Sequence, residues 1–204
     1  MSNINASNRP LAVIAYGVVA LAIVFELLVV WWMLHPQVPP DYRAYYIDHT
    51  TTCLNQPVAG DYVLGTTVSF RTGGQSLRVC GWEGPVGDGT HAVGETSRLR
   101  FALPQTPAQP LQLTLELVAV EREGYPSQRV IIEVNGRPMR TITALAGQPM
   151  TVDVDVPAEL VAANPASLEL ALQFPDAMAM SPRDSNTRKR SIKLLAAQLA
   201  PLAP

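Results

Sequence analysis

The sequence predicts an all-β domain, an antiparallel and jelly-roll-like β-sandwich, preceded by one N-terminal transmembrane helix. Three observations lead to this prediction. Residues 11–34 are apolar except for Tyr16, Gly17 and Glu26. Residues 111–117 alternate apolar and polar side chains, which is the pattern of a strand with one buried face. Short stretches of strand character recur down the chain between loops rich in Gly, Pro and Asp, as they do in sandwiches and jelly rolls.

The apolar stretch is long enough to cross a bilayer. Its length of about 24 residues corresponds to roughly 36 Å of helix, against a hydrocarbon core of about 30 Å. It leads into Trp31 and Trp32 instead of a small-x-small cleavage site, so we expect it to be retained and not removed as a signal peptide. Tryptophan prefers the headgroup layer, and Pro36, Pro39 and Pro40 prevent the helix from continuing.

One acid inside the span predicts contact with another membrane helix. Glu26 lies roughly 12 Å inside the outer end of the span, where a charged carboxylate costs about 2–3 kcal/mol or more on insertion. We therefore expect it to be protonated or to face a polar group of a partner. Gly17 and Ala20 leave a smooth face for the close approach of a second helix. The alternative is a neutral glutamic acid tolerated in a monomeric span.

Flanking charges and the cysteines predict the orientation. Arg9 and the α-amino group precede the span, whereas Asp41 and Arg43 offset each other after it, which favours a cytoplasmic N-terminus. Cys53 and Cys80 are the two cysteines of the chain, and we expect them to form a disulfide in an oxidising periplasm. The bridge closes a loop of about 28 residues and is worth roughly 3–4 kcal/mol. Two buried free thiols are the alternative.

The predicted organisation is that of a bacterial inner-membrane protein with one extracytoplasmic domain. Its parts are a cytoplasmic N-terminus (1–10), the transmembrane helix (11–34), a Pro-rich stalk (35–40), a periplasmic β-sandwich (41–200) and a C-terminal tail (201–204). The roughly 160 residues after the stalk suit a single domain with a sizeable core. A formal net charge of −2 with 16% charged residues gives no general attraction to nucleic acid, so no such partner is expected.

The remaining strands are expected where β-branched and apolar residues recur. Residues 130–134 and 137–143 flank Asn135-Gly136, and the tolerance of both residues for positive φ predicts a hairpin with a type I′ turn. The other predicted strands are 62–70, 76–82, 97–103, 151–156, 167–174 and 191–199. Residues 157–163 are predicted to form a helical turn that begins at Pro157.

The sequence contains none of the strong catalytic or metal-binding motifs, so we expect no enzyme activity, no cofactor and no metal. The sequence has no G-x-S-x-G, P-loop, H-E-x-x-H or G-x-G-x-x-G pattern, and no C-x-x-C. A small hydrolase on a jelly-roll scaffold is the minor alternative. His49 and His91 are interpreted as solvated loop histidines, and Asp153 and Asp155 as an exposed polar strand face. The basic residues within 183–193 are interpreted as a solvated loop that leads into the last strand.

The most unusual segment is the loop at residues 80–91, which contains four glycines and a proline. Long loops on rigid sandwiches are common positions for function. In a sugar site Trp82 would stack on the ring. Glu83, Asp88 and His91 would hydrogen-bond to the hydroxyl groups. The alternative is that Trp82 is a core residue packed against the predicted disulfide.

Several motifs resemble a known domain. They are Tyr42 with Cys53, Gly60-Asp61-Tyr62-Val63-Leu64-Gly65, Cys80-Gly81-Trp82 with Pro85 and Gly89, Leu99-Arg100-Phe101, Val134-Asn135-Gly136 and the segment from Ser181-Pro182 to Asn186-Thr187-Arg188. Over roughly residues 41–199 the chain resembles the extracytoplasmic β-sandwich domain attached to bacterial membrane glycosyltransferases, here as a stand-alone single-span protein. That domain has no established catalytic residues, so the resemblance implies an accessory role in envelope glycan assembly. It also makes Arg188 a candidate ligand residue, although the chain has Arg190-Ser191 where the group commonly has Leu-Gly.

The predicted function is that of a non-catalytic accessory or glycan-binding module in envelope polysaccharide or glycosyltransferase systems. Its expected partners are the membrane, a glycan and another integral membrane protein. The alternative is a structural subunit of an integral-membrane complex that docks through its transmembrane helix and has no carbohydrate role.

Overall fold

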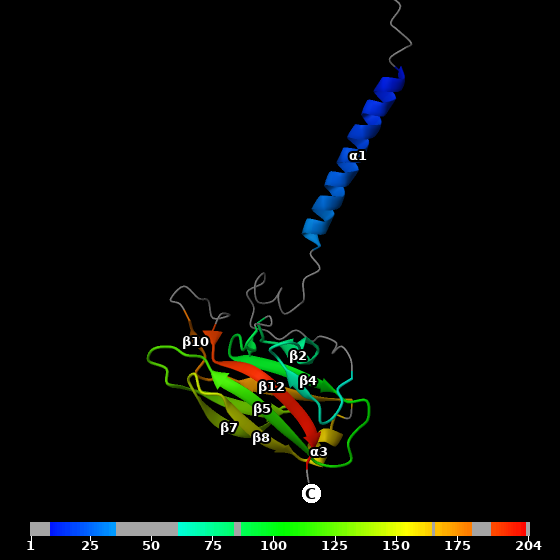
Figure 1. Ribbon diagram of the computed structural model, residues 1–204. Coiled ribbons are helices and arrows are strands. Elements are labelled where there is room, and N and C mark those ends of the chain that lie inside the picture. Colours follow the sequence, from blue (N-terminus) through cyan, green and yellow to red (C-terminus); the bar gives the residue numbers. More distant parts are fainter. Residues whose placement is uncertain (1–8, 36–60, 84–86, 165, 181–188, 203–204) are drawn as a thin grey trace, which may run out of the picture. The chain divides into compact units, whose positions relative to one another are not determined.

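The computed structural model describes residues 9–35, 61–83, 87–164, 166–180 and 189–202. The chain forms two compact units, Met1–Val38 and Pro39–Pro204. Among the described residues, the first unit contains the long helix α1, and the second is a sandwich of β-sheets with a short α-helix and a 3₁₀ turn (Figure 1).

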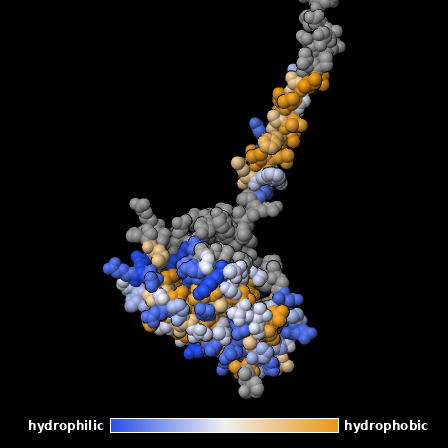
Figure 2. Space-filling view, in the orientation of Figure 1, coloured by the Kyte–Doolittle hydropathy of each residue, from blue (hydrophilic) through white to orange (hydrophobic). Residues whose placement is uncertain are grey.

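The helix α1 spans Arg9–Leu34, and its side chains from Val13 onward are almost all exposed. Within it, Val13–Leu34 is long and apolar enough to cross a membrane. Figure 2 shows that hydrophobic residues cover nearly all of its visible surface. The apolar helix predicted from the sequence is therefore present as one uninterrupted element.

In the described part of the chain, the sandwich is built from two five-stranded antiparallel sheets, with one further two-stranded antiparallel pair. Its elements in chain order are β1 (Thr67–Ser69), a 3₁₀ turn η3 (Gln75–Leu77), β2 (Arg78–Cys80), β3 (Thr90–His91), β4 (Thr96–Ala102), β5 (Leu111–Ala119), β6 (Ser127–Val134), β7 (Arg137–Leu145), β8 (Met150–Val156), α3 (Ala158–Ala162), β9 (Ser167–Gln173), β10 (Met178–Ala179), β11 (Lys189–Arg190) and β12 (Ile192–Pro201). One sheet has the order β1-β12-β5-β8, with β3 also paired to β12, and the other has the order β2-β4-β9-β6-β7. The predicted antiparallel sandwich is confirmed.

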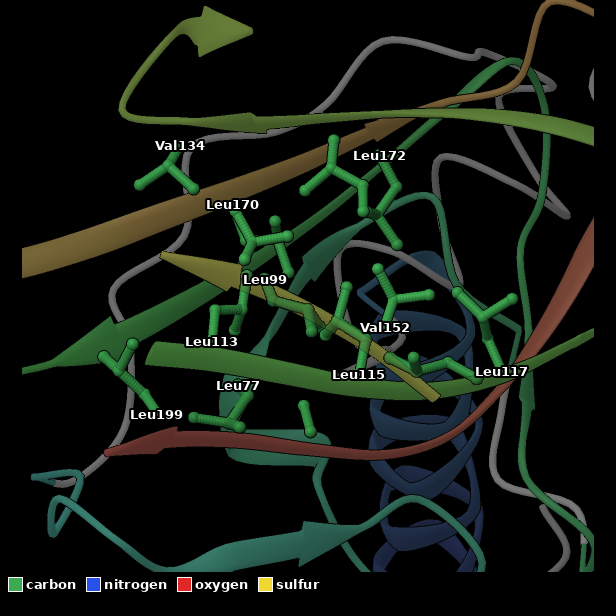
Figure 3. Close-up of a cluster of buried hydrophobic side chains, with 14 of the residues drawn as sticks. Leu77, Leu99, Leu113, Leu115, Leu117, Val134, Val152, Leu170, Leu172 and Leu199 are labelled. Atoms are coloured by element: carbon green, nitrogen blue, oxygen red, sulfur yellow. The ribbon is translucent and has the colours of Figure 1, made fainter. Parts of the chain in front are cut away.

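The core lies between the two sheets and follows from strand alternation. In β5 every second residue is fully buried and the residues between them are half-buried. In Figure 3, Leu113 and Leu115 of β5 point toward Leu99 of β4 and Leu170 of β9, in the opposite sheet. Full burial of a leucine side chain contributes roughly 1.5–3 kcal/mol, so these facing rows hold the sheets together.

The predicted hairpin turn is present and is tied to the rest of the fold. Asn135 has a φ of 47° and Gly136 a φ of 77°, as a type I′ turn requires. The Asn135 side chain donates to the Leu160 carbonyl of α3 at 2.9 Å and accepts from the Glu169 N–H of β9 at 2.8 Å. The helical turn α3, also predicted, is thereby held against the hairpin.

Two predicted strands are wrong in part. Only Thr67–Ser69 of the strand predicted at 62–70 is extended and paired. Tyr62 is buried, and its hydroxyl accepts from the Leu199 N–H at 2.9 Å. Single backbone bonds from Tyr62 N–H to the Ala102 carbonyl and from Gly65 N–H to the Leu199 carbonyl hold the rest of this segment without forming a continuous strand pairing. The strand predicted at 76–82 is divided between η3 and β2, because the Leu77 N–H donates to the Gly74 carbonyl in a tight turn.

Candidate functional site

The candidate site lies on the outer face of the sheet formed by β5, β12 and β3. Lys193 of β12 pairs with Val118 of β5 on one side and with His91 of β3 on the other. Directly paired residues of antiparallel strands share a face, so these three side chains form one row. Their neighbours Leu117 and Leu194 are buried on the opposite face, in the core. The pairing pattern thus fixes where the row points.

A pocket of about 520 Å³ opens over this row. Its apolar lining comes from Val118, Val120 and Leu195 of the sheet region and from Pro149 and Met180 of neighbouring segments. Its charged and polar lining consists of Arg71, Asp88, His91, Glu121, Arg190 and Lys193. The volume falls within the range of about 300–1,000 Å³ that is usual for small-ligand sites.

Two ion pairs hold the charged side of the pocket. Lys193 Nζ contacts the Asp88 carboxylate, and a guanidinium nitrogen of Arg190 lies 2.9 Å from Glu83 Oε2. The hydrogen bond from Lys193 holds the pKa of Asp88 below its usual value of 3.8. Glu83 is also fixed through its backbone, because its N–H donates to the His91 carbonyl at 2.9 Å.

His91 carries an orphaned polar atom. It lies half-buried in β3, and its Nδ1 is shielded from solvent without a hydrogen-bond partner in the described part of the chain. Burial lowers the pKa of His91 below 6.5, and the nearby cations Lys193 and Arg190 lower it further against the opposing carboxylates Glu83 and Asp88. This environment therefore favours the neutral imidazole. Its interpretation as a solvated loop histidine is wrong.

Trp82 is a core residue in this structure. It is 3% exposed, its indole N–H donates to the Arg98 carbonyl at 2.8 Å, and its ring stacks with Phe70 at a centroid distance of 6.5 Å. It also forms a bridge with Ala92. Trp82 therefore presents no free face to a sugar ring. The alternative interpretation, that Trp82 is a core residue, is the one that the fold supports.

The other predicted residues divide between the pocket and the segments outside the described chain. Asp88 and His91 line the pocket and Glu83 supports it through Arg190. Arg188 and Cys53 lie outside the described residues, whereas Cys80 is buried. The disulfide between Cys53 and Cys80 and the ligand role of Arg188 stay predictions.

Three cationic residues of the pocket were not predicted as ligand residues. Arg71 follows β1. Arg190 belongs to the basic segment that was interpreted as a solvated loop and lies instead in β11, whereas Lys193 lies in β12, within the strand predicted at 191–199. Gly89 allows this assembly. It has a φ of 139°, and a Cβ placed on it would lie 2.7 Å from the Leu194 carbonyl oxygen. The sequence signal that could have identified these cations is the opposite charge of this basic segment and of the acids in the 80–91 loop.

Metal binding finds no support among the described residues, where no group of three or more His, Cys, Asp and Glu side chains is placed to hold an ion. Asp153 and Asp155 are exposed on β8, as interpreted from their spacing. The Asp153 carboxylate accepts from the Thr114 hydroxyl at 2.6 Å, across the β5–β8 pair. These two acids belong to the solvated face of the sheet.

No family model matches the sequence, and no curated protein sequence matches it. Among solved structures the chain is similar to the CBM36-1 domain of a multidomain xylanase from the hindgut metagenome of Trinervitermes trinervoides, at 13% identity over 68% of this chain and 98% of that chain, with a TM-score of 0.41. A carbohydrate-binding module CBM36 in complex with calcium and xylotriose gives 9% identity over 66% and 99%, with a TM-score of 0.39. The EclA C-terminal domain, a sugar-binding protein, gives 13% identity over 72% and 88%, with a TM-score of 0.37. At these values the similarity is one of general architecture and identifies no site residue.

Proposed function

We propose that this chain is a membrane-anchored β-sandwich module that binds a saccharide in the pocket above Val118, Lys193 and His91 and catalyses no reaction on it. The observation that carries the proposal is the pocket itself, whose lining combines apolar and charged side chains on the outer face of a sheet. Pyranose rings have apolar C–H faces that pack on apolar side chains, while charged side chains bind their hydroxyl groups through strong hydrogen bonds.

The anchor and the compartment complete this proposal. The length and apolar surface of α1 support membrane insertion, and the charge of Arg9 supports a cytoplasmic N-terminus with the sandwich in the periplasm. There the module would serve envelope polysaccharide or glycosyltransferase systems, in keeping with the sequence resemblance. The predicted bridge between Cys53 and Cys80 belongs to the same compartment.

A glycan array probed with the full chain in detergent micelles tests the saccharide proposal. Val118→Trp places a large side chain in the pocket, and we expect at least a tenfold loss of glycan retention. The matched control is Gln112→Trp, on the outer face of the same strand but outside the pocket, which is expected to retain binding. Failure of the wild-type chain to retain any glycan, or equal retention by both variants, would refute the proposal.

A second candidate function is docking into an integral-membrane complex through α1. Glu26 is exposed on this otherwise apolar helix. Gly17 lies nine residues earlier, which at about 100° per residue is a rotation of about 180°, so the two residues occupy opposite faces. The three residues predicted to contact a partner helix therefore do not form one surface. Glu26 would bind a donor side chain of another membrane protein, whereas Gly17 and Ala20 belong to a separate face.

Cross-linking in native membranes tests this docking role. Glu26→Leu removes the carboxyl group, and we expect it to abolish recovery of the partner, whereas Glu26→Gln keeps a polar side chain and is expected to retain most of it. Equal recovery from the wild type and from Glu26→Leu would leave the helix as a plain tether.

A further inference from the structure

The cations of the pocket are fixed by strands, whereas one of their acidic partners is not. The side chains of Arg190 in β11 and Lys193 in β12 are only 13% and 19% exposed. The Asp88 side chain, which precedes β3 in a turn, is 66% exposed. An ion pair with such an exposed acid contributes little to stability, because the carboxylate is nearly as well solvated without its partner. The Lys193 side chain is mostly shielded from water and so gains more from the ion pair than the exposed Asp88 carboxylate does.

A third cation, Arg71, lines the same pocket and forms no ion pair with a described residue. Arg71 is exposed, and within the described chain no carboxylate lies within ion-pair distance of its guanidinium group. Glu121, the remaining acid of the lining, lies over Gly147 between β7 and β8, where a Cβ on that glycine would meet its Oε1 at 1.9 Å. With respect to the described residues, the pocket therefore offers Arg71 without an ion pair and Lys193 paired with an exposed loop carboxylate.

We propose that the pocket takes an acidic saccharide, and that in the free protein Asp88 occupies the place on Lys193 that a carboxylate or phosphate of the ligand takes on binding. This inference rests on the proposed saccharide function and names its ligand class. On binding, the ligand anion replaces the Asp88 carboxylate, which is released to water. Arg71 then contributes to the same anion or to a neighbouring acidic sugar residue through its five N–H donors.

The role of Asp88 separates this inference from a neutral-sugar site. In a neutral-sugar site Asp88 accepts hydrogen bonds from sugar hydroxyl groups, so its neutralisation weakens binding. In an acidic-sugar site Asp88 competes with the ligand for Lys193, so its neutralisation strengthens binding. The same substitution thus changes affinity in opposite directions under the two alternatives.

Calorimetry on the full chain in detergent provides the test, with two matched trisaccharides as probes. One is α-1,4-linked trigalacturonic acid and the other is α-1,4-linked galactotriose, which has a hydroxymethyl group in place of each carboxylate. We expect the wild type to prefer the acidic probe, Asp88→Asn to bind it about three- to fivefold more tightly, and Lys193→Gln to bind it at least tenfold more weakly. Asp155→Asn, an exposed acid of β8 outside the pocket, carries the same charge change and is expected to have no effect.

Each outcome has a defined meaning. Equal affinity for both probes, or weaker acidic binding by Asp88→Asn, overturns the acidic-ligand inference and leaves saccharide binding in place. Binding of neither probe, together with an empty glycan array, removes the proposed function itself. Displacement of trigalacturonic acid by an equal concentration of inorganic phosphate would indicate a bare anion site and also overturn the inference. A fall in affinity with rising salt, reduced in Lys193→Gln, is the further result expected.

Discussion

The β6–β7 turn and the pocket differ in how their polar groups are satisfied. At the turn, the Asn135 amide donates to Leu160 and accepts from Glu169, so both of its polar ends are bonded within the fold. At the pocket, His91 Nδ1 is buried without a partner in the described chain, and Arg71 forms no ion pair with a described carboxylate. Buried polar groups in native proteins are nearly always bonded, and exceptions call for an explanation. The comparison teaches that the polar groups of the turn are used within the sandwich, whereas the pocket has a polar atom without a bond in the described chain, as the proposed ligand site requires.

Substitution of Trp82 tests whether this residue of the 80–91 segment stabilises the fold or binds a ligand. Its indole N–H is bonded and its ring is buried, so Trp82 belongs with the stabilising groups. We expect Trp82→Ala to lower the free energy of unfolding by about 3–5 kcal/mol, as measured by urea denaturation. Trp82→Phe keeps most of the ring and is expected to cost less. Loss of glycan binding by Trp82→Ala with unchanged stability would instead place this residue in the site.

The predicted disulfide would add a covalent bond at Cys80, where the same 80–91 segment begins in the core. Cys80 is buried in β2, two residues before Trp82, and its predicted partner is Cys53. We expect reduction, or a double Cys→Ser variant, to lower the free energy of unfolding by about 3–4 kcal/mol, because a loop of about 28 residues is released. Mass spectrometry after alkylation without reductant is expected to detect no modified cysteine, and modification of both would contradict the bridge.

A pair of substitutions at Asn135 measures what full satisfaction of a polar side chain is worth. Asn135→Ala removes two hydrogen bonds and places a Cβ residue without a polar side chain at a φ of 47°, so we expect a loss of about 2–3 kcal/mol. Asn135→Gly removes the same bonds but accepts the positive φ, and is expected to lose about 1–2 kcal/mol. Urea denaturation of both variants gives the difference. Equal losses would show that the backbone conformation contributes nothing here.

The strand β5 and the β6–β7 turn were predicted correctly from the sequence because their signals lie in neighbouring residues. Residues 111–117 alternate and form most of β5, and Asn135-Gly136 forms the expected turn between neighbouring strands. The pocket depends on contacts between distant segments, such as Lys193 with Asp88, which are 105 residues apart. Its strands β3 and β11 have two residues each, and two residues carry no periodicity. The acids of the loop were recognised, but the cations they meet were not.

Proton binding by His91 provides the smallest and most specific test of the pocket. Burial and the cations Lys193 and Arg190 lower the pKa of His91 below 6.5, against the opposing effect of Glu83 and Asp88. Below pH 6.5 the unfolded chain therefore binds a proton more readily than the folded chain does. Stability is full above this pH and falls as the pH decreases toward the lower pKa of the folded state.

A difference measurement isolates this contribution from that of other titrating groups. Asp88 and Asp176 also have lowered pKa values, but they affect stability at more acidic pH, close to and below their usual value of 3.8. We expect the melting temperature of the wild type to fall between pH 7 and pH 5 by more than that of His91→Gln, and the two curves to run parallel above pH 7. The separation is expected to be smaller than the effect of any substitution above. Parallel curves over the whole range would show that the His91 imidazole is as well solvated in the fold as in the unfolded chain, and that the orphaned Nδ1 does not exist in solution.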